Sequence, residues 1–285
     1  MADVRAFSRA ARRAGRTVGL VPTMGALHAG HLALIRAMVR RTDAVAVSVF
    51  VNPTQFAPGE DLDRYPRDLD ADRRLAEEAG AHVLFAPPVE EIYPVEPGVW
   101  VDPGEPGRIL EGAARPTHFR GVLTVVTKLL NAVEPDWVAF GQKDAQQAVL
   151  VRRLIDDLLL PVRMWVGPTV RDPDGLALSS RNAYLDAAGR RAAPELYRSL
   201  LVGRQLLEAG ERRAGEIAAR VRARLAATGV LRPDYVAVVA ASDLSPVDPV
   251  AGRVLLLAAA VLGGVRLIDN LCLEVRGDRV APSEL

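Results

Sequence analysis

Short apolar runs alternate with helical segments over the first part of the chain, and this alternation constrains the fold more than any other feature. The runs lie at 17–21, 44–51, 82–86, 136–140 and 162–166. They contain little polar alternation, which is typical of parallel strands that are covered on both faces. The segments with helical spacing lie at 4–14, 31–41, 67–79, 117–132 and 143–158. We therefore predict an α/β domain with a doubly wound parallel sheet.

The pattern changes in the last part of the chain. Residues 186–226 are rich in Ala, Arg, Leu and Glu and predict two helices that are broken near Gly210. Short strands are then expected at 235–240, 253–261 and 265–269, and the pair Gly263 and Gly264 indicates a hairpin turn. Helices followed by consecutive strands indicate a smaller α+β domain. We predict two domains, residues 1–169 and residues 170–285.

The composition argues against several classes of partner. The 285 residues include 36 basic and 35 acidic side chains, so a net charge of +1 gives no electrostatic attraction to nucleic acid or to an anionic membrane. The apolar stretch 254–262 is too short to span a bilayer. The single cysteine, Cys272, allows no intrachain disulfide, and its leucine neighbours favour a buried strand position over catalysis. We expect a soluble cytoplasmic protein.

Two of the four histidines stand together where the first strand leads into the first long helix. His28 and His31 are three residues apart and share one face of the opening helical turn. A helix N-terminus favours a phosphate group, and Gly30 lets a nucleotide approach the backbone closely. Histidines at this place would stabilise charge on a phosphorus atom under attack. The alternatives are a metal-binding pair, for which no third ligand lies nearby in sequence, and histidines without a functional role.

Two polar segments further along the chain also contain residues suited to phosphate groups. Lys143 follows the fourth apolar run and could reach phosphate oxygens as a point charge, and Gln147 shares its helical face. Ser179, Ser180 and Arg181 offer hydroxyl groups and a guanidinium for a phosphate clamp. Each segment alone could equally be an ordinary polar helix start or a helix cap.

Two other segments offer groups for a small organic acid. Gln55 comes shortly after the second strand and has both a donor and an acceptor for a hydroxy acid, although the segment alone reads as a turn. Arg115 and His118 lie where the chain enters another helix. There Thr117 or His118 could simply cap the helix.

Taken in order, these segments resemble the pantothenate synthetase (pantoate–β-alanine ligase) family over nearly the whole chain. The segments that carry the resemblance are 22–31, 50–56, 65–67, 115–121, 143–147, 174–176, 179–182 and 269–270. The broader similarity is to nucleotidyltransferases and class I aminoacyl-tRNA synthetases, which share a His-x-Gly-His signature on a Rossmann-like sheet. The resemblance therefore implies a Rossmann-like first domain and a C-terminal α+β lid domain.

The resemblance also implies a reaction in two steps. The carboxylate of (R)-pantoate attacks the α-phosphate of ATP to give pantoyl adenylate and pyrophosphate. The amine of β-alanine then attacks the acyl carbon, which gives pantothenate and releases AMP. Magnesium accompanies the ATP, and the family resemblance suggests a homodimer.

The resemblance also implies roles for individual residues, which are assigned by their positions in the matching segments. At the phosphates it places His28, His31, Lys143, Ser179, Ser180 and Arg181. The other ATP contacts that it implies are Gly30, Gly141, Asp144, Val170 and Leu178. For pantoate it implies Met24, Gln55 and Gln147. It gives Asp72 a part in placing magnesium or the amine, and it places Arg115 and His118 near the entrance of the site.

The sequence departs from the family pattern at two positions. Gln142 stands where relatives commonly have Glu, and Ala145 stands where an aromatic residue is usual. These changes are expected to alter packing or adenosine contacts more than the type of reaction. A nucleotidyltransferase and a nucleotide-binding regulatory module without catalysis are the alternative functions. The balanced charge and the lack of an anticodon-binding extension disfavour a tRNA synthetase.

Overall fold

The computed structural model describes residues 1–285, which divide into two compact units. Unit 1 comprises Met1–Gly141 and Leu150–Gly167, and unit 2 comprises Gln142–Val149 and Pro168–Leu285. The division after Gly167 lies close to the expected boundary at 169/170. The assignment of Gln142–Val149 to unit 2 was not expected from the sequence. It has a physical cause, because the side chain of Asn270 in unit 2 hydrogen-bonds to the backbone of this segment.

Unit 1 contains a five-stranded sheet in which every pair of neighbouring strands is parallel, as predicted. The strand order is β3-β2-β1-β4-β5. The strands are β1 (Val18–Thr23), β2 (Ala44–Val49), β3 (Val83–Phe85), β4 (Trp137–Gly141) and β5 (Arg163–Gly167). The order reverses between β1 and β4, so the carboxyl ends of these two strands form the switch point at which such sheets bind ligands.

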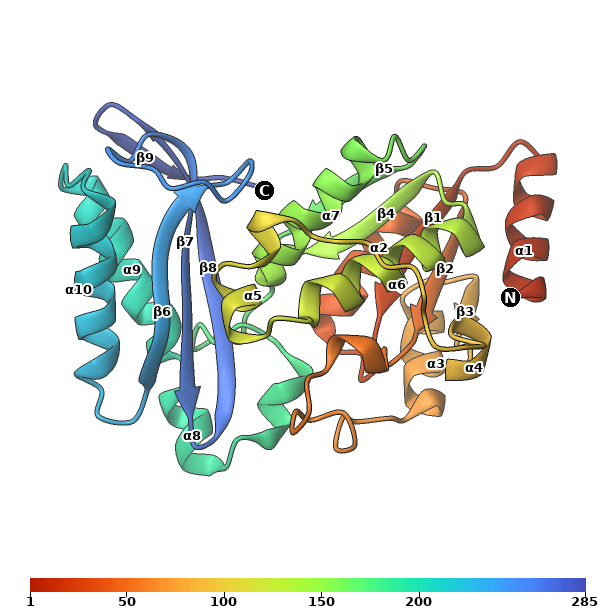
Figure 1. Cartoon of the computed structure of the whole chain (residues 1–285), viewed down its shortest axis with the longest axis horizontal. Helices are drawn as coiled ribbons and strands as arrows, with labels where there is room; N and C mark the ends of the chain where they lie inside the picture. Colours follow the sequence, from red (N-terminus) through yellow and green to blue (C-terminus); the bar gives the residue numbers. More distant parts are fainter. The chain divides into compact units, whose positions relative to one another are not determined.

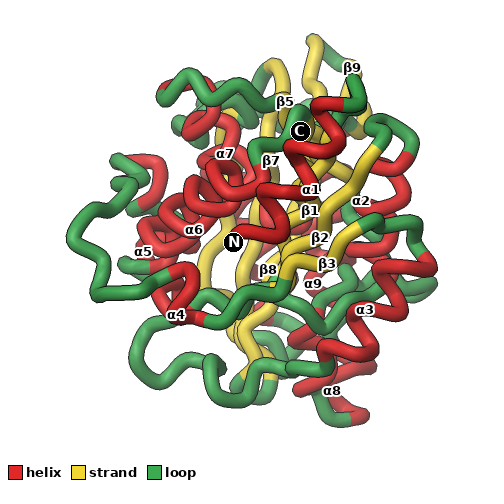
Figure 2. The backbone as a smooth tube through the Cα atoms, turned by 90° about the vertical axis from the view of Figure 1, so that its right-hand side faces the viewer, coloured by secondary structure: helices red, strands yellow, loops and turns green.

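Helices cover both faces of this sheet (Figure 2). On one side lie α2 (Ala29–Val39) and α3 (Leu69–Glu78), and on the other lie α1 (Ala2–Arg13), α6 (His118–Val133) and α7 (Ala145–Asp157). Successive residues of β2 enter different cores, since Ala46 packs with the α6 side and Val47 with the α2 side. This alternation is the two-residue period of a strand that is buried on both faces.

The proline-rich stretch 87–107 lies outside all the helices and strands predicted from the sequence. It contains the short helix α4 (Val89–Ile92) and the 3-10 turn η2 (Glu105–Gly107), and α5 (Glu111–Ala114) follows. A further 3-10 turn, η1 (Pro53–Gln55), lies in the loop after β2. Elements of one turn bury too few residues to produce a hydrophobic period, which is why the pattern did not reveal them.

Unit 2 combines helices with an antiparallel sheet of order β6-β7-β8-β9 (Figure 1). The helices are α8 (Ala187–Ala192), α9 (Glu195–Glu208) and α10 (Ala214–Ala226), with the 3-10 turns η3 (Gln142–Asp144) and η4 (Ser180–Tyr184). The strands are β6 (Arg232–Ala240), β7 (Gly252–Leu262), β8 (Val265–Arg276) and β9 (Arg279–Pro282). The expected hairpin turn is confirmed, because Gly263 and Gly264 have φ values of +55° and +83°.

Two features of unit 2 differ from the sequence expectation. The first predicted helix of 186–226 is divided into α8 and α9 at Pro194, a residue that cannot donate a hydrogen bond within a helix. Strand β8 continues well beyond Asp269 and pairs with β9. Asp269 and Asn270 are polar but buried, so the hydrophobic pattern ended too early.

The core of unit 2 lies between its sheet and the helices α9 and α10 (Figure 1). Leu200 and Leu207 of α9 pack with Ile217 and Val221 of α10 against Leu256 of β7. Gly203 allows this close approach, because a Cβ there would lie 2.5 Å from Leu256. Across both units, no helix combines the length and the apolar character needed to cross a membrane.

Gly121 of α6 provides a test of how closely this helix packs on η1. A Cβ at Gly121 would lie 2.4 Å from the carbonyl oxygen of Thr54 and 2.8 Å from the Cα of Gln55, and neither backbone atom can move aside cheaply. We expect Gly121→Ala to destabilise the protein by about 1–3 kcal/mol in urea unfolding. Gly215→Ala in α10 is the control, since a Cβ there meets nothing within 4 Å. Equal stability of the two variants would contradict the close packing.

Candidate active site

The turn between β1 and α2 leaves the sheet in a tightly held conformation. The hydroxyl of Thr23 donates to the carbonyl oxygen of Ser48 at 2.7 Å and accepts the N–H of Gly25 at 3.1 Å. Gly25 has a φ of +82° and Ala26 a φ of +50°. A Cβ on Gly25 would lie 2.7 Å from a carboxylate oxygen of Asp72, so only glycine fits this position.

Asp72 holds this turn from α3. Its side chain is buried, with 2% of its surface exposed. One carboxylate oxygen accepts the N–H of Leu27 at 2.7 Å and the other accepts the N–H of Ala26 at 3.1 Å. Both oxygens are therefore engaged with the backbone that leads to His28. The assignment of Asp72 to magnesium or to the amine stays a prediction, and its contacts give it a role in shaping the turn.

His28 and His31 form a joined pair at the N-terminus of α2. Their ring centroids are 4.1 Å apart. The Nδ1 atom of His28 accepts the N–H of Gly30 at 3.1 Å, and the Nδ1 atom of His31 accepts the N–H of His28 at 3.3 Å. Because both Nδ1 atoms accept, each neutral ring carries its proton on Nε2. The pair thus presents two Nε2–H donors at the positive end of a helix dipole.

Gly30 is required by the histidine pair itself. A Cβ on Gly30 would lie 2.9 Å from Cε1 and 3.0 Å from Nδ1 of His28, so a larger residue would push the His28 ring out of place. The close approach of backbone and ring explains the glycine without reference to a nucleotide.

A second polar group in unit 1 follows β2, which neighbours β1 in the sheet. Gln55 has 7% of its surface exposed, and its side-chain amide is held at both ends. Its Nε2 atom donates to the sulfur of Met24 at 2.9 Å, and its Oε1 atom accepts from Asn52 at 3.1 Å. The structure therefore brings together Met24 and Gln55, two of the three residues that the resemblance assigns to pantoate.

Asn52 is a buried member of this group that the sequence did not single out. It is 1% exposed. Its Nδ2 atom donates to Gln55 and also to the carbonyl oxygen of Gly121 at 3.2 Å, while its Oδ1 atom accepts from Tyr93 at 3.0 Å. Burial raises the pKa of Tyr93 and outweighs its hydrogen bond with Thr54, which lowers the pKa. The only sequence signal was an asparagine before a proline at the end of a strand.

Arg115 and His118 meet next to this group. Arg115 makes two hydrogen bonds of 2.6 Å to the carboxylate of Glu60. Burial alone would raise the pKa of Glu60, but the guanidinium outweighs this effect and the pKa is lowered. His118 is 9% exposed, and burial together with the charge of Arg115 lowers its pKa to about 4. Thr117 is the N-cap residue of α6 and makes no capping hydrogen bond with its side chain.

In unit 2, the segment after β4 is held by Asn270 of β8. The Nδ2 atom of Asn270 donates to the carbonyl oxygens of Gln142 at 2.9 Å and Lys143 at 3.0 Å. The Nε2 atom of Gln142 donates back to Oδ1 of Asn270 at 3.3 Å. The side-chain amide of Gln142 therefore has a hydrogen-bond partner within the protein, which gives it a structural role. Lys143 has its ammonium 3.6 Å from Asp144, and Gln147 lies half-buried in the first turn of α7.

The other predicted residues of unit 2 lie in one folded segment. The N–H of Leu178 donates to the carbonyl oxygen of Val170 at 3.0 Å, so these two residues are neighbours. Ser179 caps η4 by accepting the N–H of Arg181 at 3.3 Å, and Ser180 is the first residue of that turn. The helix cap that the sequence left open as an alternative is therefore present. The phosphate role of these side chains stays a prediction.

The acidic residues and histidines do not form a metal cage. The chain contains no group of three or more His, Cys, Asp or Glu side chains arranged to hold a metal ion. A Mg²⁺ ion usually keeps several waters and binds substrate phosphates with one or two carboxylates, so it does not need such a cage.

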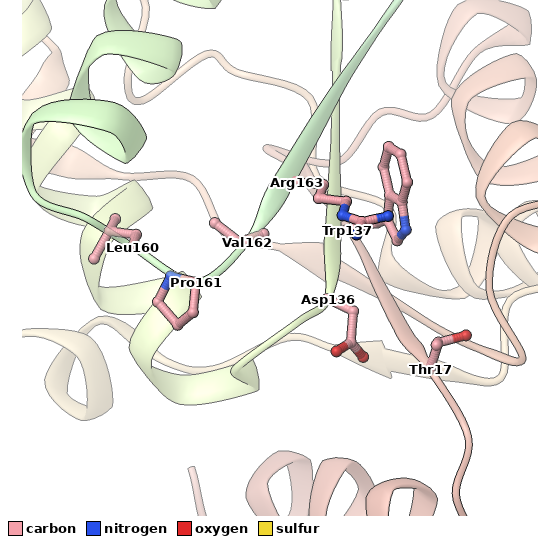
Figure 3. Close-up of a pocket in the computed structure, with 7 residues that line it drawn as sticks. All are labelled: Thr17, Asp136, Trp137, Leu160, Pro161, Val162 and Arg163. Carbon is pink, nitrogen blue, oxygen red and sulfur yellow. The ribbon is translucent and has the colours of Figure 1, made fainter.

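One cavity lies away from all these residues, at the amino ends of β1, β4 and β5 (Figure 3). It has a volume of about 500 Å³ and is lined by Thr17, Asp136, Trp137, Leu160, Pro161, Val162 and Arg163. The carboxylate of Asp136 accepts the N–H of Val18 at 2.7 Å, and the guanidinium of Arg163 lies over the ring of Trp137. Its polar groups thus support the edge of the sheet.

Comparison with known proteins agrees with these features. A family model described as pantoate-beta-alanine ligase matches residues 1–272. The pantothenate synthetase of Moorella thermoacetica is 51% identical over 275 residues, which are 96% of this chain and 97% of that protein. The pantothenate synthetase of Chloroflexus aurantiacus is 53% identical over 270 residues, which are 94% of this chain and 96% of that protein.

Solved structures of similar proteins have the same fold as this chain. The crystal structure of pantothenate synthetase from Thermus thermophilus matches with a TM-score of 0.88 and 47% identity, over 94% of this chain and 96% of that one. A pantoate-beta-alanine ligase from Francisella tularensis, complexed with beta-gamma ATP and beta-alanine, matches with a TM-score of 0.74 and 34% identity, over 94% of this chain and 95% of that one.

The contacts of Asp72 predict the effect of removing its charge. In Asp72→Asn one oxygen is replaced by an NH₂ group, which faces a backbone N–H and cannot accept from it. We expect a loss of about 1–3 kcal/mol in urea unfolding together with lower ligase activity. Asp70→Asn is the matched control, because Asp70 lies on the same helix with 79% of its side chain exposed. A higher magnesium requirement without any loss of stability would instead support the role at the metal.

The lowered pKa of His118 predicts a pH dependence of stability. In the unfolded chain His118 has its ordinary pKa of 6.5, so it takes up a proton between pH 6.5 and about 4 that the folded chain does not bind. Stability is therefore lost as the pH falls through this window. Between about pH 7 and about pH 4 the wild type should lose roughly 3 kcal/mol more than His118→Asn, measured by urea unfolding. Identical pH profiles would show that the imidazole is not held neutral.

Proposed function

The chain belongs to the pantoate–β-alanine ligase family, and from this premise we propose that it condenses pantoate with β-alanine in a reaction driven by ATP. One observation in this molecule carries the proposal. The phosphate-binding features follow β1 and the buried amide of Gln55 follows β2, and these neighbouring strands end side by side, with Thr23 opposite Val49. Groups suited to a nucleotide phosphate and to an organic acid therefore leave one edge of one sheet.

The first step transfers an adenylyl group to the acid. A carboxylate oxygen of pantoate attacks the α-phosphorus of ATP, and the bond to the bridging oxygen of pyrophosphate breaks. The two Nε2–H groups of His28 and His31 stabilise the negative charge that develops on the phosphate oxygens. Backbone contacts hold both rings before substrate binds, so little reorganisation is needed.

The second step transfers the acyl group to the amine. The neutral amine of β-alanine attacks the acyl carbon of pantoyl adenylate, AMP leaves, and the amine loses a proton. The mixed anhydride must be kept from water until the amine arrives, which is the reason to assign a lid role to residues 170–285.

Gln55 and Met24 are proposed to receive pantoate. The Gln55 amide offers a donor and an acceptor, and the Met24 thioether contributes an apolar, adaptable surface. Because the Gln55 side chain is buried and uncharged, it suits a hydroxyl and a carboxylate better than a phosphorylated substrate. Gln147 is proposed as the third member of this group.

The residues of unit 2 are proposed to act on ATP. Lys143 would contact the β- and γ-phosphates as a point charge, and Ser179, Ser180 and Arg181 would contact the triphosphate and then pyrophosphate. Asp144 is proposed on the adenosine side, and Val170 and Leu178 are proposed as further ATP contacts, as are Gly141 and Gly30 of unit 1. Mg²⁺ would arrive with ATP, held mainly by its phosphates. A homodimer is proposed from the family resemblance.

The reaction and the role of His31 can be tested together. Purified protein is incubated with ATP, Mg²⁺ and pantoate, β-alanine is then added, and pyrophosphate and AMP are followed. We expect pyrophosphate release to depend on pantoate and AMP release to depend on both acids. His31→Ala should slow adenylate formation by about 10²-fold or more.

His82→Ala is the matched control for His31→Ala. His82 lies before β3 at the amino edge of the sheet, where its Nδ1 accepts the N–H of Val45, so its loss should leave the rate nearly unchanged. No AMP formation dependent on both acids in the wild type would refute the ligase function. Equal rates for wild type and His31→Ala would refute the role of that histidine.

A further inference from the structure

Three charged or titratable side chains of unit 1 have no part in the reaction as derived above. Two of them contact the backbone carbonyl oxygen of Gln55, beside the proposed pantoate site, and the third contacts one of these two. Nη2 of Arg115 donates to the carbonyl oxygen of Gln55 at 3.2 Å. Nδ1 of His118 lies 3.0 Å from the same oxygen. Glu60 engages the guanidinium of Arg115 from the other side. We refer to Glu60, Arg115 and His118 as the Gln55 clamp.

The hydrogen-bond pattern determines the state of His118. A carbonyl oxygen can only accept, so Nδ1 of His118 carries a proton and donates to Gln55. The Nε2 atom of His118 lies 3.2 Å from Nη1 of Arg115, which can only donate, so Nε2 accepts. His118 is therefore neutral with its proton on Nδ1, and the lowered pKa agrees with this assignment.

Glu60 fixes the orientation of Arg115. The ion pair is bidentate, and its side chains are only 15% exposed for Arg115 and 23% exposed for Glu60. Glu60 and Gln55 belong to the same loop after β2, whereas Arg115 and His118 lie at the junction of α5 and α6. The clamp therefore ties that loop to the start of α6 at two points.

The side chain of Gln55 makes its own contacts, separate from those of its carbonyl oxygen. These contacts form only when the backbone of Gln55 is in its observed position. Its amide contacts Asn52 and Met24, and Asn52 in turn donates to Gly121 of α6. Helix α6 also packs closely against the backbone of Gln55, because a Cβ at Gly121 would lie only 2.8 Å from the Cα of Gln55. If the carbonyl of Gln55 moves, the amide that would receive pantoate moves with it. A displacement of about 1 Å at a positioning group can cost about 10²-fold in rate.

We propose that Glu60, Arg115 and His118 are positioning residues that hold the Gln55 carbonyl and thereby set the affinity for the hydroxy acid, while leaving the affinity for ATP unchanged. This inference rests on the proposed function, since it takes Gln55 as a contact of pantoate. A direct contact between Arg115 and the substrate carboxylate is the competing role. It would require the substrate to displace Glu60, which already occupies the guanidinium with two short hydrogen bonds.

The test compares variants of His118 in steady-state assays of the full-length protein with ATP, pantoate and β-alanine. His118→Leu removes the donor to Gln55, and His118→Asn keeps a donor N–H at nearly the Nδ1 position. We expect His118→Leu to raise KM for pantoate by roughly tenfold, in line with the loss of a buried hydrogen bond. KM for ATP should be unchanged, and His118→Asn should restore most of the affinity for pantoate.

Glu60→Gln provides a second, milder variant in case His118→Leu does not fold. It weakens the hold on Arg115 and should raise KM for pantoate by a smaller factor, again without an effect on KM for ATP. Glu105→Gln is the matched control, because Glu105 pairs with Arg108 at 2.6 Å on the exposed surface. The control should leave both KM values unchanged.

The outcomes separate the clamp from the proposed function. A wild type without AMP formation dependent on both acids would overturn the proposed function itself. An active wild type whose clamp variants keep the normal KM for pantoate, or raise KM for ATP equally, would overturn the clamp alone. A larger effect of Arg115→Lys than of His118→Leu, with no rescue by His118→Asn, would support direct substrate binding by Arg115 instead.

Discussion

The parallel pairing of β1 with β2 and β4 is the constraint on which the site of unit 1 depends. Parallel strands end at the same edge of a sheet, so the loops that follow them start from neighbouring positions. Met24 continues from β1 and Asn52 follows β2, and the two loops meet in the contact between Met24 and Gln55. The amino edge carries a cavity whose polar groups support the sheet. The amino edge of the sheet thus carries supporting contacts, and the carboxyl edge carries the residues proposed to bind substrate.

Buried polar side chains determine the shape of the loops that carry the proposed site residues. Asp72 holds the backbone before His28, Asn52 holds Gln55 and Gly121, and in unit 2 Asn270 holds Gln142 and Lys143. A buried polar group left without a partner costs about 1–3 kcal/mol, so each of these contacts favours one loop conformation over others. The side chains proposed to act on substrate are therefore attached to backbone that other elements hold in place.

The histidine pair shows how local and long-range contacts combine. The hydrogen bonds that set the tautomer of His28 and His31 are local, since they join atoms within residues 28–31 only. The direction in which the turn enters α2 depends on Asp72, which lies 45 residues away from Leu27 in sequence. Glycine is needed at Gly25 because a Cβ there would come too close to Asp72. It is needed at Gly30 because a Cβ there would come too close to His28. Both glycines are explained by close contacts of the protein with itself.

Most of the regular elements could be predicted because each buries enough residues to show a period. All five strands of the parallel sheet and its long helices fall near their expected ranges, whereas α4, α5 and β9 are too short to give a pattern. Strand β8 was predicted only in part because Asp269 and Asn270 are buried polar residues. The site residues could be selected from motif order, but their partners could not, since Asn270 lies 128 residues from Gln142.

The sequence by itself determined the alternation of strands and helices, the histidines at a helix start and the family to which the chain belongs, because these depend on local spacing and order. Only the tertiary structure decided that Asp72 shapes the turn before His28, that Gln142 pairs with Asn270 and that His118 is held neutral against Gln55. These outcomes depend on burial and on partners from distant elements. A carboxylate, an amide or an imidazole has no fixed role until its desolvation and its hydrogen bonds are known.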